Sequence, residues 1–320
     1  MPVISSESAG PSSATADSAT RVWPIPLVIA GSFGVYLLAS LFAVMVATFV
    51  VEGSDGLEAL RDQDRIAAVL RSPLGMTITV VLPQVGMLLP ILAAAIASPV
   101  PFATRLGLRR GDWPLGLWLI AALGTPMVGM ISSLIVGGLM GESETLEEMS
   151  DVFRNLGQAG YLWPLALMIG ATPGICEELV FRGYVQTRLV HVGGAGVGIL
   201  ITSVIFAAFH MDWVHSTAVF ALGVYLGWIA WAGGSIWPAM LGHFVNNFLS
   251  VVAVVVLPEA VTDGTLADEA VAEMPAGIAV GFAVVVLLSG VCLLMTFSSA
   301  WRHRRRNAVG STPVADQNGG

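Results

Sequence analysis

The sequence predicts an all-α membrane protein, a polytopic bundle of about eight transmembrane helices, on the basis of three observations. The 320 residues are 55% hydrophobic and only 11% charged, with a mean hydropathy of +0.80. The apolar residues come in runs long enough to cross a hydrocarbon core of about 30 Å, whereas a soluble domain would scatter them at helix or strand period. Arginines gather in alternate connections. This composition excludes a soluble globular protein and indicates the lipid bilayer, not nucleic acid, as partner.

The predicted spans are the hydrophobic segments at roughly residues 25–50, 75–98, 114–140, 161–190, 194–212, 215–232, 235–257 and 276–299. Several prolines lie inside them and are expected to kink the helices, which is tolerated where neighbouring helices satisfy the freed carbonyl groups. These prolines are Pro83, Pro90, Pro126, Pro164 and Pro173. A short surface helix is expected within residues 56–71.

The orientation follows from arginine in the short connections. One cluster follows the second span and another follows the last, so both stretches are expected to be cytoplasmic, and with them both termini. The clusters are Arg105, Arg109 and Arg110, and Arg302, Arg304, Arg305 and Arg306. Two of the connections on the other side are acidic, and the third, residues 52–73, is mixed, with three arginines and five acids. All 14 basic residues are arginine, which suggests a GC-biased bacterial genome, and we expect a multi-pass protein of the cell membrane.

The chain divides into five predicted parts. A disordered cytoplasmic tail comes first and a basic cytoplasmic tail last, and the candidate catalytic core lies between two groups of spans. The parts are residues 1–22 (tail), 23–160 (N-terminal transmembrane helices), 161–257 (catalytic core), 258–301 (outer loop and last span) and 302–320 (basic tail).

Polar residues recur inside three successive spans, where a charged side chain costs at least about 2.5 kcal/mol and so becomes a functional hypothesis. The fourth span carries Glu177 and Glu178, with Arg182 four residues after the second acid. The fifth ends on His210, and the seventh carries His243 and Asn247.

Helical spacing indicates that these groups share one site. Glu178 and Arg182 are one turn apart and can pair, which leaves Glu177 on an adjacent face. The fourth and fifth spans are expected to form a hairpin about residues 191–195, which places Glu177 and His210 at nearly equal depth. The seventh span starts from the same side, so His243 and Asn247 fall within a turn or two of that layer.

Such a layer can activate water in two ways. A glutamate among apolar neighbours can act as a general base while histidine or asparagine donors stabilise an oxyanion. Alternatively, Glu177, His210 and His243 can ligate a divalent metal such as zinc, which lowers the pKa of bound water. The residues alone leave both routes open.

The three blocks resemble the CPBP family of intramembrane proteases, named for CAAX proteases and bacteriocin-processing enzymes. The family pattern is a di-glutamate with arginine four residues later, then Phe-x-x-x-His, then His-x-x-x-Asn. This chain has Glu177-Glu178 with Arg182, Phe206 with His210, and His243 with Asn247, over about residues 161–250.

The resemblance implies an eight-helix protease that cleaves membrane-associated protein or peptide substrates. It also implies that Glu177 activates the water and that His210, His243 and Asn247 complete the site. Eukaryotic relatives act on prenylated CAAX proteins, and the implication for this chain stops at endopeptidase activity, with a metalloprotease as the convention of the family.

Other interpretations of the same residues remain open. The Glu-Glu-Arg block can be a buried ion-pair network, His210 an interfacial histidine, and His215 a loop or interface residue. A transporter also places carboxylates and broken helices at mid-membrane, although no second copy of the Pro173-Gly174 break occurs. A non-enzymatic immunity or scaffold protein would tolerate loss of Glu177.

Overall fold

The structure is a computed structural model that describes residues 22–141, 143–258 and 274–310. Every regular element among these residues is helical, and seven helical stretches are long and apolar enough to cross a membrane. The predicted fold class, an all-α polytopic bundle, is therefore confirmed. The predicted N-terminal tail, except Val22, lies outside the described residues, as does most of the acidic connection after residue 258.

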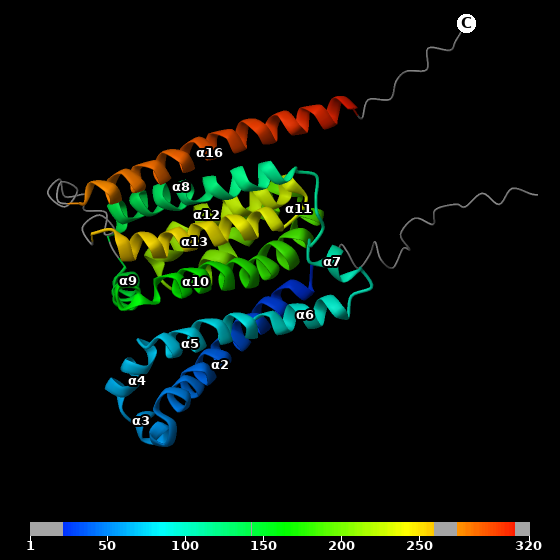
Figure 1. The fold of residues 1–320 in the computed structure, drawn as a ribbon. Helices are drawn as coiled ribbons and strands as arrows, with labels where there is room; N and C mark the ends of the chain where they lie inside the picture. The colour runs from blue at the N-terminus through cyan, green and yellow to red at the C-terminus, as the bar shows by residue number, and fades with distance from the viewer. Residues whose placement is uncertain (1–21, 142, 259–273, 311–320) are drawn as a thin grey trace, which may run out of the picture.

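The N-terminal part forms a layer beside the other helices (Figure 1). It comprises α2 (Pro24–Glu52), η1 (Gly53–Asp55), α3 (Gly56–Ala59), α4 (Gln63–Leu70), α5 (Pro73–Gly86) and α6 (Leu88–Ile96). The single surface helix expected within residues 56–71 is in fact two short helices. The second span is broken at Met87, because Pro90 lacks an N–H and its ring clashes with the carbonyl group one turn earlier.

The remaining helices form the main bundle. They are α7 (Phe102–Arg105), α8 (Leu115–Met140), α9 (Glu144–Leu156), α10 (Leu162–Glu178), α11 (Thr187–Ala208), α12 (Trp213–Gly233), α13 (Trp237–Val256) and α16 (Ala276–Gly310), with π-helical segments η2 (Gly157–Tyr161) and η3 (Leu179–Gln186). α13 packs against both α10 and α8, and α8 also packs against α12 and α16. The last helix continues to Gly310, past the expected end of the span at residue 299.

The hairpin expected between the fourth and fifth spans is present, although the helical run from Glu144 to Ala208 is nearly continuous. Gly194 has φ 78° and ψ 170°, a conformation that favours glycine, and it reverses the chain within α11. The two arms touch closely, since a Cβ on Gly198 would lie 2.6 Å from the Val190 side chain. The segment after the turn therefore packs back on η3, as Phe181 and Phe206 show with ring centroids 5.3 Å apart.

Two glycines let α10 and α13 approach each other closely. A Cβ on Gly170 would lie 2.9 Å from the Phe244 ring, and one on Gly174 would lie 3.2 Å from the Phe244 backbone nitrogen. Small residues four apart are a common device for packing helices in membranes, where dispersion contacts replace the hydrophobic driving force. This close packing brings Glu178 of α10 beside His243 of α13.

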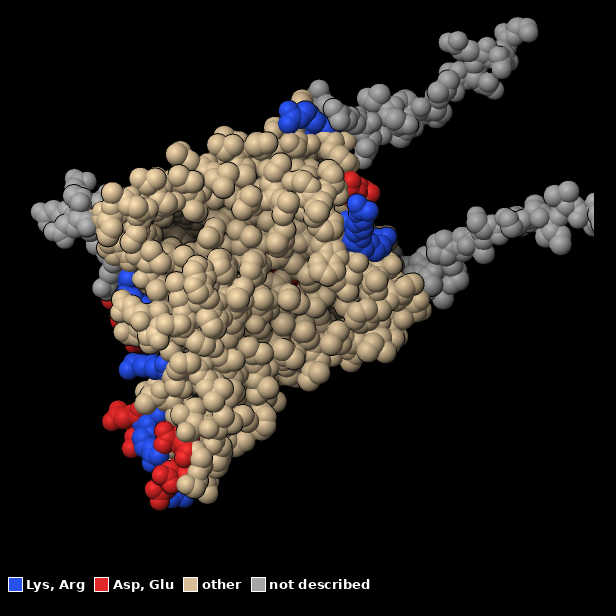
Figure 2. Space-filling model, viewed as in Figure 1, with Lys and Arg blue, Asp and Glu red and all other residues tan. Residues whose placement is uncertain are grey.

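The acidic connection after α8 folds into the amphipathic helix α9, which we did not expect from its charge. Ser143 caps its N-terminus, and Phe153 and Leu156 are buried against α10 and α13 while the acids face outward. Ser143 also donates to Asp212, which caps α12. Figure 2 shows that the charged side chains seen in this view gather at the two ends of the molecule, with a largely uncharged face between them.

Candidate active site

The buried acid of α10 is neutralised by an arginine one turn later. Arg182 Nη1 donates to Glu178 Oε1 at 2.6 Å, and both side chains are fully buried. Arg182 Nη2 donates to the Gly223 carbonyl group at 3.0 Å, and its guanidinium lies 4.4 Å from the centroid of the Phe206 ring. The pairing follows the four-residue spacing, and the contacts to α11 and α12 hold the carboxylate in one orientation.

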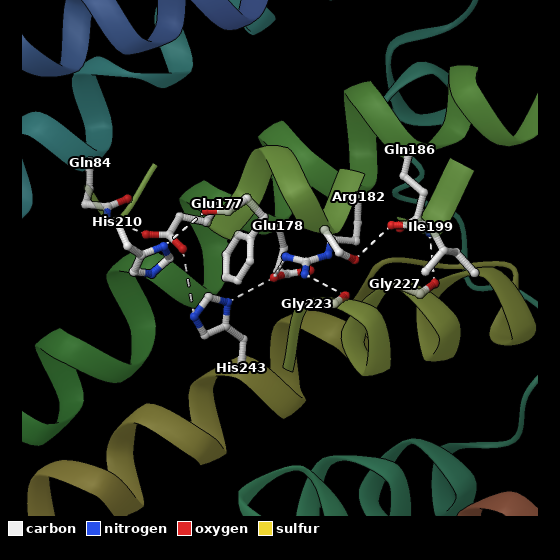
Figure 3. A network of polar contacts seen from close by, with 12 residues as sticks. Gln84, Glu177, Glu178, Arg182, Gln186, Ile199, His210, Gly223, Gly227 and His243 are labelled. Carbon is white, nitrogen blue, oxygen red and sulfur yellow. Dashed lines mark hydrogen bonds and ion pairs between the residues drawn. The ribbon is translucent and has the colours of Figure 1, made fainter. Parts of the chain in front are cut away.

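His243 lies between the two glutamates (Figure 3). Its Nδ1 is 2.9 Å from Glu178 Oε1, and its Nε2 is 3.9 Å from Glu177 Oε2. Because an ionised carboxylate only accepts hydrogen bonds, Nδ1 carries a proton toward Glu178 and Nε2 is the nitrogen that faces Glu177. Glu178 thereby orients the imidazole and can stabilise a positive charge on it.

Glu177 has one oxygen held and one free. Gln84 Nε2, from α5, donates to Glu177 Oε1 at 2.8 Å. Oε2 has no hydrogen-bond partner among the described residues, and the side chain is 13% exposed. Gln84 was not among the predicted site residues, although the rule applied to the glutamates could have found it: it is the single amide side chain of its apolar span.

His210 lies two residues after the end of α11, and the view in Figure 3 draws its ring on the side of Glu177. Its Nδ1 lies 3.1 Å from the Phe206 carbonyl oxygen, so Nδ1 is the donor and Nε2 is the nitrogen left for other partners. The Phe206 ring contacts both histidines, with centroid separations of 5.1 Å to His210 and 5.9 Å to His243. His215, interpreted as a loop or interface residue, lies in the first turn of α12 and not in a loop, and its ring is 4.6 Å from that of His210.

Asn247 makes its hydrogen bonds to the backbone of α10 and to Asn246, and not to the side chains of the other predicted site residues in the described part of the chain. Its Nδ2 donates to the Ile169 carbonyl oxygen at 3.3 Å, and its Oδ1 accepts from Asn246. Pro173 has no N–H, so the carbonyl group four residues before it, that of Ile169, lacks its helical donor. Asn247 therefore satisfies a carbonyl group freed by the kink, about two turns before Glu177. Its expected role in stabilising an oxyanion stays a prediction.

The three residues expected to ligate zinc do not form a metal site in the described part of the chain. No set of three His, Cys, Asp or Glu side chains there is placed to hold a metal ion. Glu177 and His243 face each other, and the Nδ1 of His210 donates to a backbone carbonyl group, which leaves Nε2 as the nitrogen available to a ligand. Zinc binding stays a prediction.

Residues 159–249 match the family model described as Rce1-like, type II CAAX prenyl endopeptidase Rce1-like. This match is consistent with an Rce1-like domain of the CAAX protease family. This domain spans α10 to most of α13 and includes all six predicted site residues, whereas Gln84 lies outside it. No curated protein sequence and no solved structure matches the chain. At the level of the family, the Rce1-like domain supports a membrane endopeptidase that acts on membrane-associated peptides.

Proposed function

We propose that the protein is an intramembrane endopeptidase in which Glu177 activates the water that hydrolyses a peptide bond. One observation carries the proposal. The carboxylate of Glu177 has one oxygen fixed by Gln84 and the other free, 3.9 Å from an imidazole nitrogen, inside an apolar bundle. A carboxylate held in this way, with one unpaired oxygen directed at the imidazole of His243, is suited to act as a general base.

The proposed reaction begins with transfer of a proton from water to Glu177 Oε2 as the water oxygen attacks the carbonyl carbon. The carbonyl electron pair moves to oxygen, and in this proposal His210 and His243, protonated at Nε2, donate hydrogen bonds to the oxyanion. The tetrahedral intermediate then collapses, the C–N bond breaks, and the Glu177 carboxyl group gives its proton to the leaving amine. Glu178 supports the positive charge on His243, in the way that a buried carboxylate orients a catalytic histidine.

The direct test compares wild-type protein with Glu177→Gln and Glu177→Ala in liposomes that carry a library of membrane-tethered peptides. Each peptide is presented with and without a prenyl group, because the matching family model is described by its prenyl substrates. Loss of a general base typically lowers the rate by about 10²- to 10⁴-fold. Glu147→Gln, on α9, is the matched control and keeps wild-type cleavage. Equal cleavage by the wild type and Glu177→Gln would refute the proposal.

A second experiment separates the two routes of water activation. The wild-type protein is dialysed against a zinc chelator before the assay. Activation by the carboxylate alone leaves the rate unchanged. A loss that added zinc restores would assign the activation of water to a metal.

The physiological substrate is sought by comparing the termini of membrane proteins in cells that carry the wild-type or the Glu177→Ala protein. New termini that need Glu177 identify cleavage sites. Identical termini in the two strains, together with an unchanged phenotype, would favour a scaffold.

A further inference from the structure

Gln84 reaches the carboxylate of Glu177 from a helix outside the Rce1-like domain. Its Nε2 donates to Glu177 Oε1 at 2.8 Å (Figure 3). We propose that Gln84 is a positioning residue, which fixes one oxygen of Glu177 so that the other faces the water and the imidazole of His243. This inference rests on the proposed role of Glu177 as the general base.

The helix that carries Gln84, α5, packs between two other helices. α5 packs against both α2 and α10. A Cβ on Gly86 would lie 3.0 Å from the Ala39 side chain, so the last turn of α5 is close to α2. Pro83 is buried immediately before Gln84, and the helix breaks at Met87 immediately after this turn. A side chain on such a restrained turn reaches a definite point, which is what a positioning group requires.

The orientation of the amide depends on Glu177. Gln84 Oε1 is buried and has no hydrogen-bond partner among the described residues. An ionised carboxylate accepts hydrogen bonds only, so the NH₂ group of Gln84 must face it, because the opposite orientation would bring two acceptors together.

The same bond restrains Glu177. The terminal torsion of a glutamate is broad, with no sharp preference for one rotation of the carboxylate. Holding Oε1 removes this freedom and leaves Oε2 in a constant direction, 3.9 Å from His243 Nε2. Loss of Gln84 should therefore slow the chemical step while the binding of substrate stays nearly the same.

The test measures kcat and KM for Gln84→Leu on a membrane-tethered peptide that the wild type cleaves. Loss of a hydrogen bond to a charged group should lower kcat by about 10- to 100-fold with KM within about twofold. The matched control is Gln186→Leu. Gln186 is another buried amide, but its Nε2 donates to the Gly227 carbonyl group and not to Glu177. We expect its kcat within about twofold of wild type, whatever it does to stability.

Two further variants keep the inference falsifiable if Gln84→Leu fails to fold. Gln84→Asn keeps an amide but withdraws it by one methylene, and Gln84→Glu keeps the shape but replaces the donor with an acid. Thermal unfolding in detergent identifies which variants are native. A native Gln84 variant of any of the three kinds with wild-type kcat would overturn the inference, as would an equal fall in kcat for Gln186→Leu.

The outcomes also separate this inference from the proposed function. If wild type cleaves, Glu177→Gln does not, and Gln84→Leu matches wild type, only the role of Gln84 fails. If Glu177→Gln cleaves as well as wild type, the proposed function fails first.

Discussion

Replacing Arg182 with methionine removes the positive charge that accompanies the buried acid of α10. The arginine makes an ion pair with Glu178, donates to the Gly223 carbonyl group and lies over the Phe206 ring. Glu178 is 0% exposed, so Arg182→Met leaves a buried carboxylate without its cation, with His243 Nδ1 as its remaining hydrogen-bond partner. Removing one partner of a buried pair destabilises a protein by about 3–5 kcal/mol, and we expect a loss of that size.

The double variant Glu178→Leu/Arg182→Met should recover most of that stability. It removes both charges and replaces them with apolar side chains, a change that is often neutral or stabilising. The remaining cost is the lost partner of His243 Nδ1, about 1 kcal/mol. We therefore expect the double variant within about 2 kcal/mol of wild type, yet poor in cleavage because His243 has lost its orientation.

The assay is reversible unfolding in mixed micelles with increasing SDS, followed by tryptophan fluorescence, on wild type, both single variants and the double variant. The coupling energy from the cycle measures the pair. A loss below about 1 kcal/mol for Arg182→Met, or a double variant as unstable as that single variant, would refute the view that the arginine neutralises a buried carboxylate.

Three further predictions concern positions around the site. Asn247→Leu should leave the carbonyl group freed by Pro173 without a hydrogen-bond donor and so lower the free energy of unfolding by about 1–3 kcal/mol. Pro173→Ala in the same protein should restore the stability. Cleavage that stays low in this restored double variant would show that Asn247 also acts on the reaction. Gly174→Leu should separate α10 from α13 and cost about 1–3 kcal/mol by overpacking in the same unfolding assay, whereas a stable and active variant would contradict the close approach. The backbone N–H of His215 donates to the Asp212 carboxylate. This hydrogen bond is the main reason that the pKa of Asp212 lies below the ordinary value of 3.8. The ionised Asp212 therefore stabilises the fold above pH 3.8, and this stabilisation is lost as the pH falls through its lower folded-state pKa. Asp212→Asn should flatten the dependence of stability on pH below about pH 4. An unchanged dependence would exclude this role.

Local spacing explains the part of the site that was predicted correctly. Glu178 and Arg182 lie one helical turn apart, so their contact follows from the helix itself, whichever neighbours it has. The hairpin was also predictable, because two apolar runs are separated by a glycine-rich turn at Gly194. The helical content and the order of the spans follow in the same way, since a bilayer permits few structures other than helices for long apolar runs.

Contacts between distant helices were not predictable in the same way. The bond from Gln84 to Glu177 joins residues 93 positions apart, and no periodicity indicates which face of α5 meets α10. Asn247 was assigned to the reacting groups because it lies one turn from His243, yet the structure directs its amide to a carbonyl group of α10. The acids after α8 indicated a surface connection, but not that Phe153 would dock a helix there.

Apolar run length, turn residues and one-turn spacing are properties of a single segment, so the sequence alone was enough to predict the membrane-spanning helices, their order and the Glu178–Arg182 pair. The direction in which Glu177 presents its free oxygen depends on how α5, α10 and α13 rotate and approach one another. This direction is set by side-chain packing among segments far apart along the chain. Glycines allow the helices to make close contact, and a proline frees a carbonyl group, so only the assembled bundle defines where the free oxygen points.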